Sequence, residues 1–75
     1  MNKADLEPLV RDAVIALGGR ASVLEVAKYI WANHEEKLRA AGDLFYTWQY
    51  DMRWAAQRLR DTNHLRLDGR YWVSN

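Results

Sequence analysis

The chain has 75 residues, 49% of them hydrophobic and 12% aromatic, which suits one small domain and excludes a disordered segment. It has no cysteine, which excludes disulfides and thiolate zinc sites, and no stretch of about 20 apolar residues that could cross a bilayer. The net charge is +1, but residues 1–44 carry six basic and seven acidic side chains, whereas the remainder carries five arginines and three acids. This asymmetry modestly favours an anion-binding C-terminal half.

Apolar residues at helical spacing predict a first helix over about residues 5–17. Asp5 is the expected N-cap, and Pro8 falls in the first turn, where its missing N–H removes no helical hydrogen bond. Gly18 and Gly19 follow the last apolar position and can adopt the positive φ that ends a helix. Both boundaries of this helix are therefore marked in the sequence.

A short extended link at residues 20–21 precedes a second helix. Ser22 and Glu25 have the spacing of a capping box, in which each side chain accepts a hydrogen bond from a free N–H at the helix start. The link is too short for anything but a sharp turn between the two helices. The expected apolar face of the second helix consists of Val23, Val26, Ala27, Ile30 and Trp31.

The stretch over residues 33–43 allows two interpretations. Either the second helix breaks and a short extra helix forms over residues 34–41, ending at Gly42, or the second helix simply continues. We favour the break, which makes residues 43–46 a loop before the third helix.

The third helix is predicted over residues 47–62, with Thr47 as its N-cap and Asp51 near its positive end. Asn63 is expected to end it in the left-handed conformation. A helical wheel divides its residues into two faces. The expected core face consists of Trp48, Met52, Ala55, Ala56 and Leu59.

A β-hairpin is predicted after this helix. Its strands are residues 64–67 and 70–73, joined by Asp68 and Gly69, a pair that favours a type I′ turn. A lone hairpin is marginal in water, so it should dock on the helices, with residues 20–21 as a candidate third strand. The expected anchors are Leu65, Leu67, Trp72 and Val73.

The predicted fold is therefore α+β and mainly helical: a winged helix-turn-helix with the hairpin as its wing. Several short motifs also resemble the N-terminal winged-helix module of Mrr-type restriction proteins, with two departures: Asn63 stands where glycine is usual, and an arginine follows Gly69 instead of preceding it. The residues that carry the resemblance are Gly18-Gly19, Glu25-Val26, Gly42, Trp54-Ala55, Leu59, Leu65 and the terminal Gly-Arg-Tyr-Trp-Val.

In that family the module is thought to help recognise DNA while a separate nuclease domain cuts it. The resemblance therefore implies DNA binding without cleavage here, by a free-standing module or a fragment of a longer protein.

Double-stranded DNA is the expected partner, with the third helix in the major groove and the hairpin on the backbone or in the minor groove. Arginine and glutamine side chains offer paired hydrogen-bonding groups that match purine edges. The candidate DNA-binding residues are Gln49, Tyr50, Arg53, Gln57 and Arg58 on the helix, and Arg66 and Arg70 on the wing. The competing interpretation is that these are ordinary solvated arginines, some paired with Asp51, Asp61 or Asp68.

An aromatic stripe on the third helix, made of Tyr46, Tyr50 and Trp54, has three interpretations. It could stack on sugars or unpaired bases, pack beneath residues 33–45 and the hairpin, or form a homodimer seam. Packing is the favoured interpretation. The alternative function is accordingly a protein-interaction or homodimerisation winged helix that uses these three side chains.

A catalytic role is not expected. His34 and Glu35 begin like a zinc-protease motif, but Leu38 occupies the position of its second histidine. Ser22 is better explained as a helix cap than as a nucleophile. We therefore predict a single cytoplasmic domain over residues 1–75, with no metal, cofactor, small-molecule substrate or membrane partner.

Overall fold

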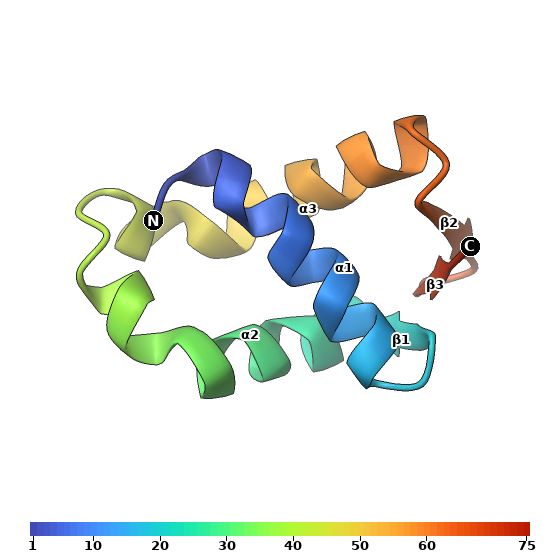
Figure 1. Cartoon of the computed structure of the whole chain (residues 1–75), viewed down its shortest axis with the longest axis horizontal. Helices are drawn as coiled ribbons and strands as arrows, with labels where there is room; N and C mark the ends of the chain where they lie inside the picture. Colours follow the sequence, from blue (N-terminus) through green and yellow to red (C-terminus); the bar gives the residue numbers. More distant parts are fainter.

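The computed structural model describes all 75 residues as three main helices and a three-stranded antiparallel sheet. The elements are a 3-10 turn η1 (Lys3–Asp5), α1 (Leu6–Ala16), β1 (Arg20–Ser22), α2 (Val23–Arg39), α3 (Leu44–Asp61), β2 (Leu65–Asp68) and β3 (Tyr71–Ser74). In Figure 1, α1 lies between α2 and α3, and the sheet lies at the opposite end of the helices from the α2–α3 connection. The expected α+β, mainly helical class is confirmed. None of the helices combines the length and the apolar character that a membrane span requires.

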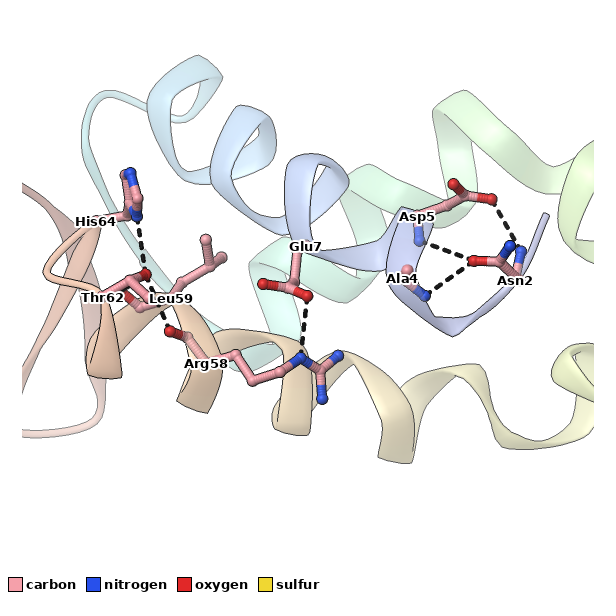
Figure 2. A network of polar contacts seen from close by, with 8 residues as sticks. All are labelled: Asn2, Ala4, Asp5, Glu7, Arg58, Leu59, Thr62 and His64. Atoms are coloured by element: carbon pink, nitrogen blue, oxygen red, sulfur yellow. Dashed lines mark hydrogen bonds and ion pairs between the residues drawn. The ribbon is translucent and has the colours of Figure 1, made fainter.

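The N-terminal cap differs from the prediction. Asn2, not Asp5, is the capping side chain: its Oδ1 accepts hydrogen bonds from the N–H groups of Ala4 and Asp5 (Figure 2). The carboxylate of Asp5 accepts from the Asn2 N–H at 2.9 Å and makes no cap hydrogen bond to α1. The prediction was wrong because η1 adds one turn before α1, which places Asp5 at the third position of a capping box.

The start of α2 agrees with the sequence. The Ser22 hydroxyl accepts from the Glu25 N–H at 3.2 Å, and the Glu25 carboxylate accepts from the Ser22 N–H at 2.9 Å. The pKa of Glu25 is held below its ordinary value by hydrogen bonding to its carboxylate, most strongly from the Ser22 backbone and next from the Ser22 side chain. The link before this helix is strand β1, which pairs with β3 as anticipated, in register Ala21 opposite Trp72.

The stretch after residue 33 combines both predicted alternatives. The backbone leaves helical geometry at His34, where φ is −134°, but α2 resumes and ends only at Arg39. The resumed turn is held because Leu38 is fully buried and because the Arg39 guanidinium hydrogen-bonds Glu35 at 2.9 Å and lies 5.1 Å from the ring of Trp31. The break is thus a kink, with no separate helix over residues 34–41.

Helix α3 begins at Leu44, so the predicted loop over residues 43–46 and the cap at Thr47 are wrong. Leu44 is buried, which favours an earlier start, and the Thr47 hydroxyl donates to the Asp51 carboxylate at 2.7 Å from within the helix. Asp51 is consequently buried in the body of α3, two turns after the helix start, and does not lie at the N-terminus of the helix. Asn63 has a φ of 62° and follows the helix in the left-handed conformation, as predicted.

The predicted core face of α3 is confirmed, since all five of its residues are buried. They join one cluster of 16 buried hydrophobic residues that includes side chains from every main helix and all three strands. At the edge of this cluster the rings of Trp31 and Trp48 stack with centroids 6.1 Å apart and an interplanar angle of 9°. This single core fixes the position of the hairpin relative to α3.

The hairpin turn is one residue later than predicted. Asp68 pairs with Tyr71, so the two-residue loop is Gly69-Arg70, and a positive φ occurs only at Gly69, as in a type II′ turn. The Asp68 carboxylate lies 3.3 Å from the Arg20 guanidinium of β1.

Two of the four expected hairpin anchors are confirmed: Leu65 and Trp72 are buried. Leu67 lies on their side of the sheet but is 54% exposed. Val73 is on the other side, in register with Arg20 and Arg66, because side chains alternate between the faces of a strand. The buried core ends near Leu65 and does not extend along β2 as far as Leu67.

Candidate functional site

A hollow of about 420 Å³ lies where α3, the β2–β3 hairpin and the first residue of α2 meet. Its polar lining consists of three arginines and one glutamine, with no acidic side chain. The lining residues are Arg53, Trp54, Gln57 and Arg60 from α3, Leu67, Arg70 and Trp72 from the hairpin, and Val23 from α2. The hollow is therefore both cationic and partly apolar.

Helix α3 positions its contribution by simple periodicity. Arg53, Gln57 and Arg60 are spaced i, i+4 and i+7, which places them on one side of the helix. The opposite side packs into the core through residues such as Met52 and Ala56, both buried. Because the core holds one face of α3, the other is presented toward the hairpin at a fixed angle.

The polar side chains of the hollow differ in their partners. Arg60 donates to the side-chain oxygen of Gln57, whose amide nitrogen donates to the Asp61 carboxylate at 3.0 Å. Arg53 and Arg70 take part in none of the four ion pairs, and the Arg70 guanidinium lies 5.6 Å from the ring centroid of Tyr71. Two guanidinium groups are thus free to bind an anion without breaking an ion pair.

The structure brings together only part of the predicted DNA-binding set. Arg53, Gln57 and Arg70 line the hollow, whereas Gln49 lines a separate hollow of about 430 Å³ between α2 and α3. Tyr50 lies beside the first hollow, with its ring edge-on to Trp54 and the centroids 6.3 Å apart.

The two other predicted arginines lie elsewhere. Arg58 reaches α1, where its Nε donates to the Glu7 carboxylate at 3.0 Å (Figure 2). Arg66 alternates with Leu65 and Leu67 along β2, so it lies on the sheet face that points away from the hollow. Neither residue is a member of the arginine cluster that α3 and the hairpin form.

None of the acidic partners proposed in the competing interpretation forms an ion pair with an arginine of the hollow. Asp51 binds Thr47 and lies 3.8 Å from Lys3, and Asp68 pairs with Arg20. Asp61 accepts from Gln57. Of the predicted arginines only Arg58 has an ion pair, so the hollow keeps its positive charge.

The aromatic stripe is on the surface. Tyr46 is 83% exposed, Tyr50 65% and Trp54 49%, so the interpretation that the stripe packs beneath residues 33–45 and the hairpin is wrong for both tyrosines. The kinked end of α2 instead lies beside Phe45, with the Arg39 guanidinium 5.9 Å from the centroid of the Phe45 ring. Trp54 alone approaches the hairpin, as part of the hollow.

Four residues of the hollow were not identified from the sequence as site residues: Val23, Arg60, Leu67 and Trp72. The signal for Arg60 was present, because it lies seven residues after Arg53 and three after Gln57 on the same helical face. Leu67 carried no such signal, since an apolar residue in a strand is expected to face the core. Leu67 is exposed because the buried core ends near Leu65, and the alternation of residues along β2 does not reveal where the core ends.

No group of three or more histidine, aspartate or glutamate side chains comes together in a way that could hold a metal ion. Comparison with known proteins adds no identity: no family model, no curated protein and no solved structure matches the chain. The resemblance to Mrr-type modules stays a prediction.

Proposed function

We propose that this chain is a winged helix-turn-helix domain that binds double-stranded DNA. Helix α3 would enter the major groove and the β2–β3 hairpin would act as the wing, on the backbone or in the minor groove. The observation that carries the proposal is the acid-free hollow lined by Arg53, Arg60 and Arg70.

The architecture supports the proposal. Three helices precede a hairpin, and β1, between α1 and α2, pairs with β3 to give the strand order β1-β3-β2. This element order is that of a winged helix, in which the third helix and the wing point toward the same side. The resemblance to Mrr-type modules, in which the winged helix is thought to help recognise DNA, points to the same function.

The charge distribution supports phosphate binding despite a net charge of only +1. Four arginines at or beside the hairpin end of α3 make no ion pair: Arg53, Arg60, Arg66 and Arg70. If each neutralises one phosphate, log K should fall with log salt with a slope of about −3.6. Affinity would then fall about 150-fold between about 50 and 200 mM salt.

The side chains of α3 also suit base recognition. Arginine pairs bidentately with guanine and glutamine with adenine, and Arg53 and Gln57 are one helical turn apart. Gln57 already exchanges hydrogen bonds with Arg60 and Asp61, which restricts its amide before DNA arrives. We infer that Arg53 is freer than Gln57 to contact DNA, because it has no internal partner to give up.

The test is the affinity for a mixed-sequence duplex, measured by fluorescence anisotropy at several salt concentrations. The variants R53A and R70A should each weaken binding and reduce the salt slope by about 0.9, and the double variant should have a slope of about −1.8. Lys37→Ala is the matched control, because Lys37 lies at the far end of α2, near Met1 and His34. Equal effects of all three single substitutions would refute a site at the hollow.

A second candidate function is protein binding or homodimerisation through Tyr46, Tyr50 and Trp54. The observation that favours it is the exposure of the two tyrosines, 83% and 65%, on a helix whose other face is fully packed. An aromatic interface should be nearly insensitive to salt. Sedimentation of the protein with and without the substitution Tyr46→Ala measures self-association directly.

A further inference from the structure

The hollow contains more apolar surface than phosphate binding requires. Half of its eight lining residues are apolar, and two of these are well exposed: Trp54 at 49% and Leu67 at 54%. The two side chains come from different elements, α3 and β2. A ligand that only carried phosphates would leave both in contact with water.

The placement of Leu67 follows from the hairpin register. Leu65 and Leu67 are two residues apart on the same side of β2, and Leu65 is buried in the core while Leu67 extends past it. Opposite Leu67 in β3 is Trp72, which is buried and forms the floor of the same region. The register therefore places the Leu67 side chain at the hollow, where it stays exposed because it lies beyond the core.

We propose that the hollow receives one unpaired nucleobase of an otherwise duplex DNA. This inference rests on the proposed function, because the duplex on either side of the unpaired base would be held by α3 and the hairpin. The base would lie against Trp54 and Leu67, while Arg53, Arg60 and Arg70 bind the flanking phosphates.

The chemistry of the hollow fits a base. The hollow is an open depression on the surface, so a base could enter it from solvent. A base has an apolar face that stacks on an indole ring and a polar edge that the guanidinium and amide groups of this lining can recognise. The ring of Tyr50, edge-on to Trp54, extends the aromatic surface outside the hollow.

An unpaired base is the occupant that the energetics favour. A base within an intact duplex must first be unstacked and unpaired to enter a pocket, at a cost of a few kcal/mol, whereas a bulged base has largely met that cost already. Stacking of one base on an aromatic side chain corresponds to about 5-fold to 150-fold in affinity. A duplex with one bulged nucleotide should therefore bind more tightly than the perfect duplex.

The test compares three labelled duplexes by anisotropy at one salt concentration: a perfect duplex, the same duplex with one bulged nucleotide, and a duplex whose bulge is an abasic site. The abasic bulge reproduces the bend but offers no base. We expect at least about 5-fold tighter binding to the bulged duplex than to either of the others. Leu67→Ala and Trp54→Phe should both reduce this preference, measured for each variant as the ratio of its affinities for the bulged and the abasic duplex.

Tyr46→Ala is the control, because Tyr46 is on the aromatic stripe but does not line the hollow. Circular dichroism of each variant confirms that it folds. Equal affinity for the bulged and the abasic duplex would overturn the inference and leave duplex binding intact. No binding to any of the three duplexes would overturn the proposed function with it.

Discussion

Arg53 and Arg70 line the same hollow from opposite sides, one from the middle of α3 and the other from the turn between β2 and β3, and neither has an acidic partner. Like charges repel, so the arrangement is unfavourable for folding on its own account. It becomes favourable when an anion binds between them. The packing of Leu65 and Trp72 into the core keeps the hairpin in place in spite of this repulsion.

Arg60 and Arg58 provide a sharp test of which face of α3 contacts DNA. Arg60 lines the hollow, whereas Arg58 is paired with Glu7 of α1. Substitution of Arg60 by alanine should reduce the salt slope of duplex binding by about 0.9, since it removes one phosphate contact. Arg58→Ala should leave the slope unchanged and cost at most about 1 kcal/mol of stability. Titrations of both variants at four salt concentrations measure the slopes, and a smaller slope for R58A than for R60A would reverse the assignment.

The capping box at the start of α2 predicts a pH dependence. The pKa of Glu25 is lowered in the folded state by hydrogen bonds from Ser22, so its contribution to stability is present above the ordinary value of 4.5 and is lost as the pH falls through the lower, folded value. Glutamine at this position still accepts a hydrogen bond but does not titrate. Between about pH 6 and pH 3 the melting temperature of the wild type should therefore fall by more than that of Glu25→Gln, as measured by thermal unfolding.

Ser22→Ala tests the same cap without a change of charge. It removes the side-chain acceptor for the Glu25 N–H and should destabilise the fold by about 0.5–2 kcal/mol in urea unfolding. Ser22 is not one of the buried core residues, so the variant should retain the native near-UV circular dichroism spectrum. A loss of stability below this range would mean that water replaces the hydroxyl at little cost.

Exposed Thr47 and buried Asp51 form a partly buried polar contact within α3. Thr47→Val removes the donor 2.7 Å from the Asp51 carboxylate, which is left with Lys3 at 3.8 Å, and should cost about 1–3 kcal/mol. In the T47V background, the further substitution Asp51→Ala should cost less than it does in the wild type, because its partner is already gone. Additive losses in this double-mutant cycle would show that the two side chains do not interact.

Gly18 and Gly19 both have a positive φ, but only Gly19 also faces strand β3. A Cβ at Gly19 would lie 3.1 Å from the Ser74 hydroxyl oxygen, whereas nothing lies within 4 Å at Gly18. Alanine at either position should destabilise by about 1 kcal/mol or more through backbone strain. Gly19→Ala should cost more than Gly18→Ala, and urea unfolding of the two variants gives the difference.

Most of the fold could be predicted from the sequence because its signals are local. The capping box at Ser22, the glycines after α1 and the left-handed Asn63 each depend on a few neighbouring residues. The two errors at helix starts differ in kind. The cap by Asn2 is local, since its hydrogen bonds reach only two and three residues along the chain, and was overlooked. The start of α3 three residues before Thr47 depends on burial of Leu44 in the core, which no local pattern encodes.

The candidate site was less predictable than the fold for the same reason. The helical periodicity of α3 is sufficient to group Arg53 with Gln57 and Arg60. It cannot reveal that Glu7 of α1 pairs with Arg58, or that the hairpin turn lies one residue later and brings Arg70 into the hollow. Those relationships depend on how α1 and the hairpin pack against α3, which no local pattern encodes.

The most direct test of DNA binding at this surface is an NMR titration of labelled protein with a mixed-sequence duplex at about 50 mM salt, repeated at about 200 mM. The account predicts chemical-shift changes on the outward face of α3 and in the β2–β3 hairpin, centred on Arg53, Gln57, Arg60 and Arg70. At the higher salt the affinity should fall by about two orders of magnitude. The absence of shifts at both salt concentrations, or shifts centred on Tyr46 that salt does not weaken, would contradict it.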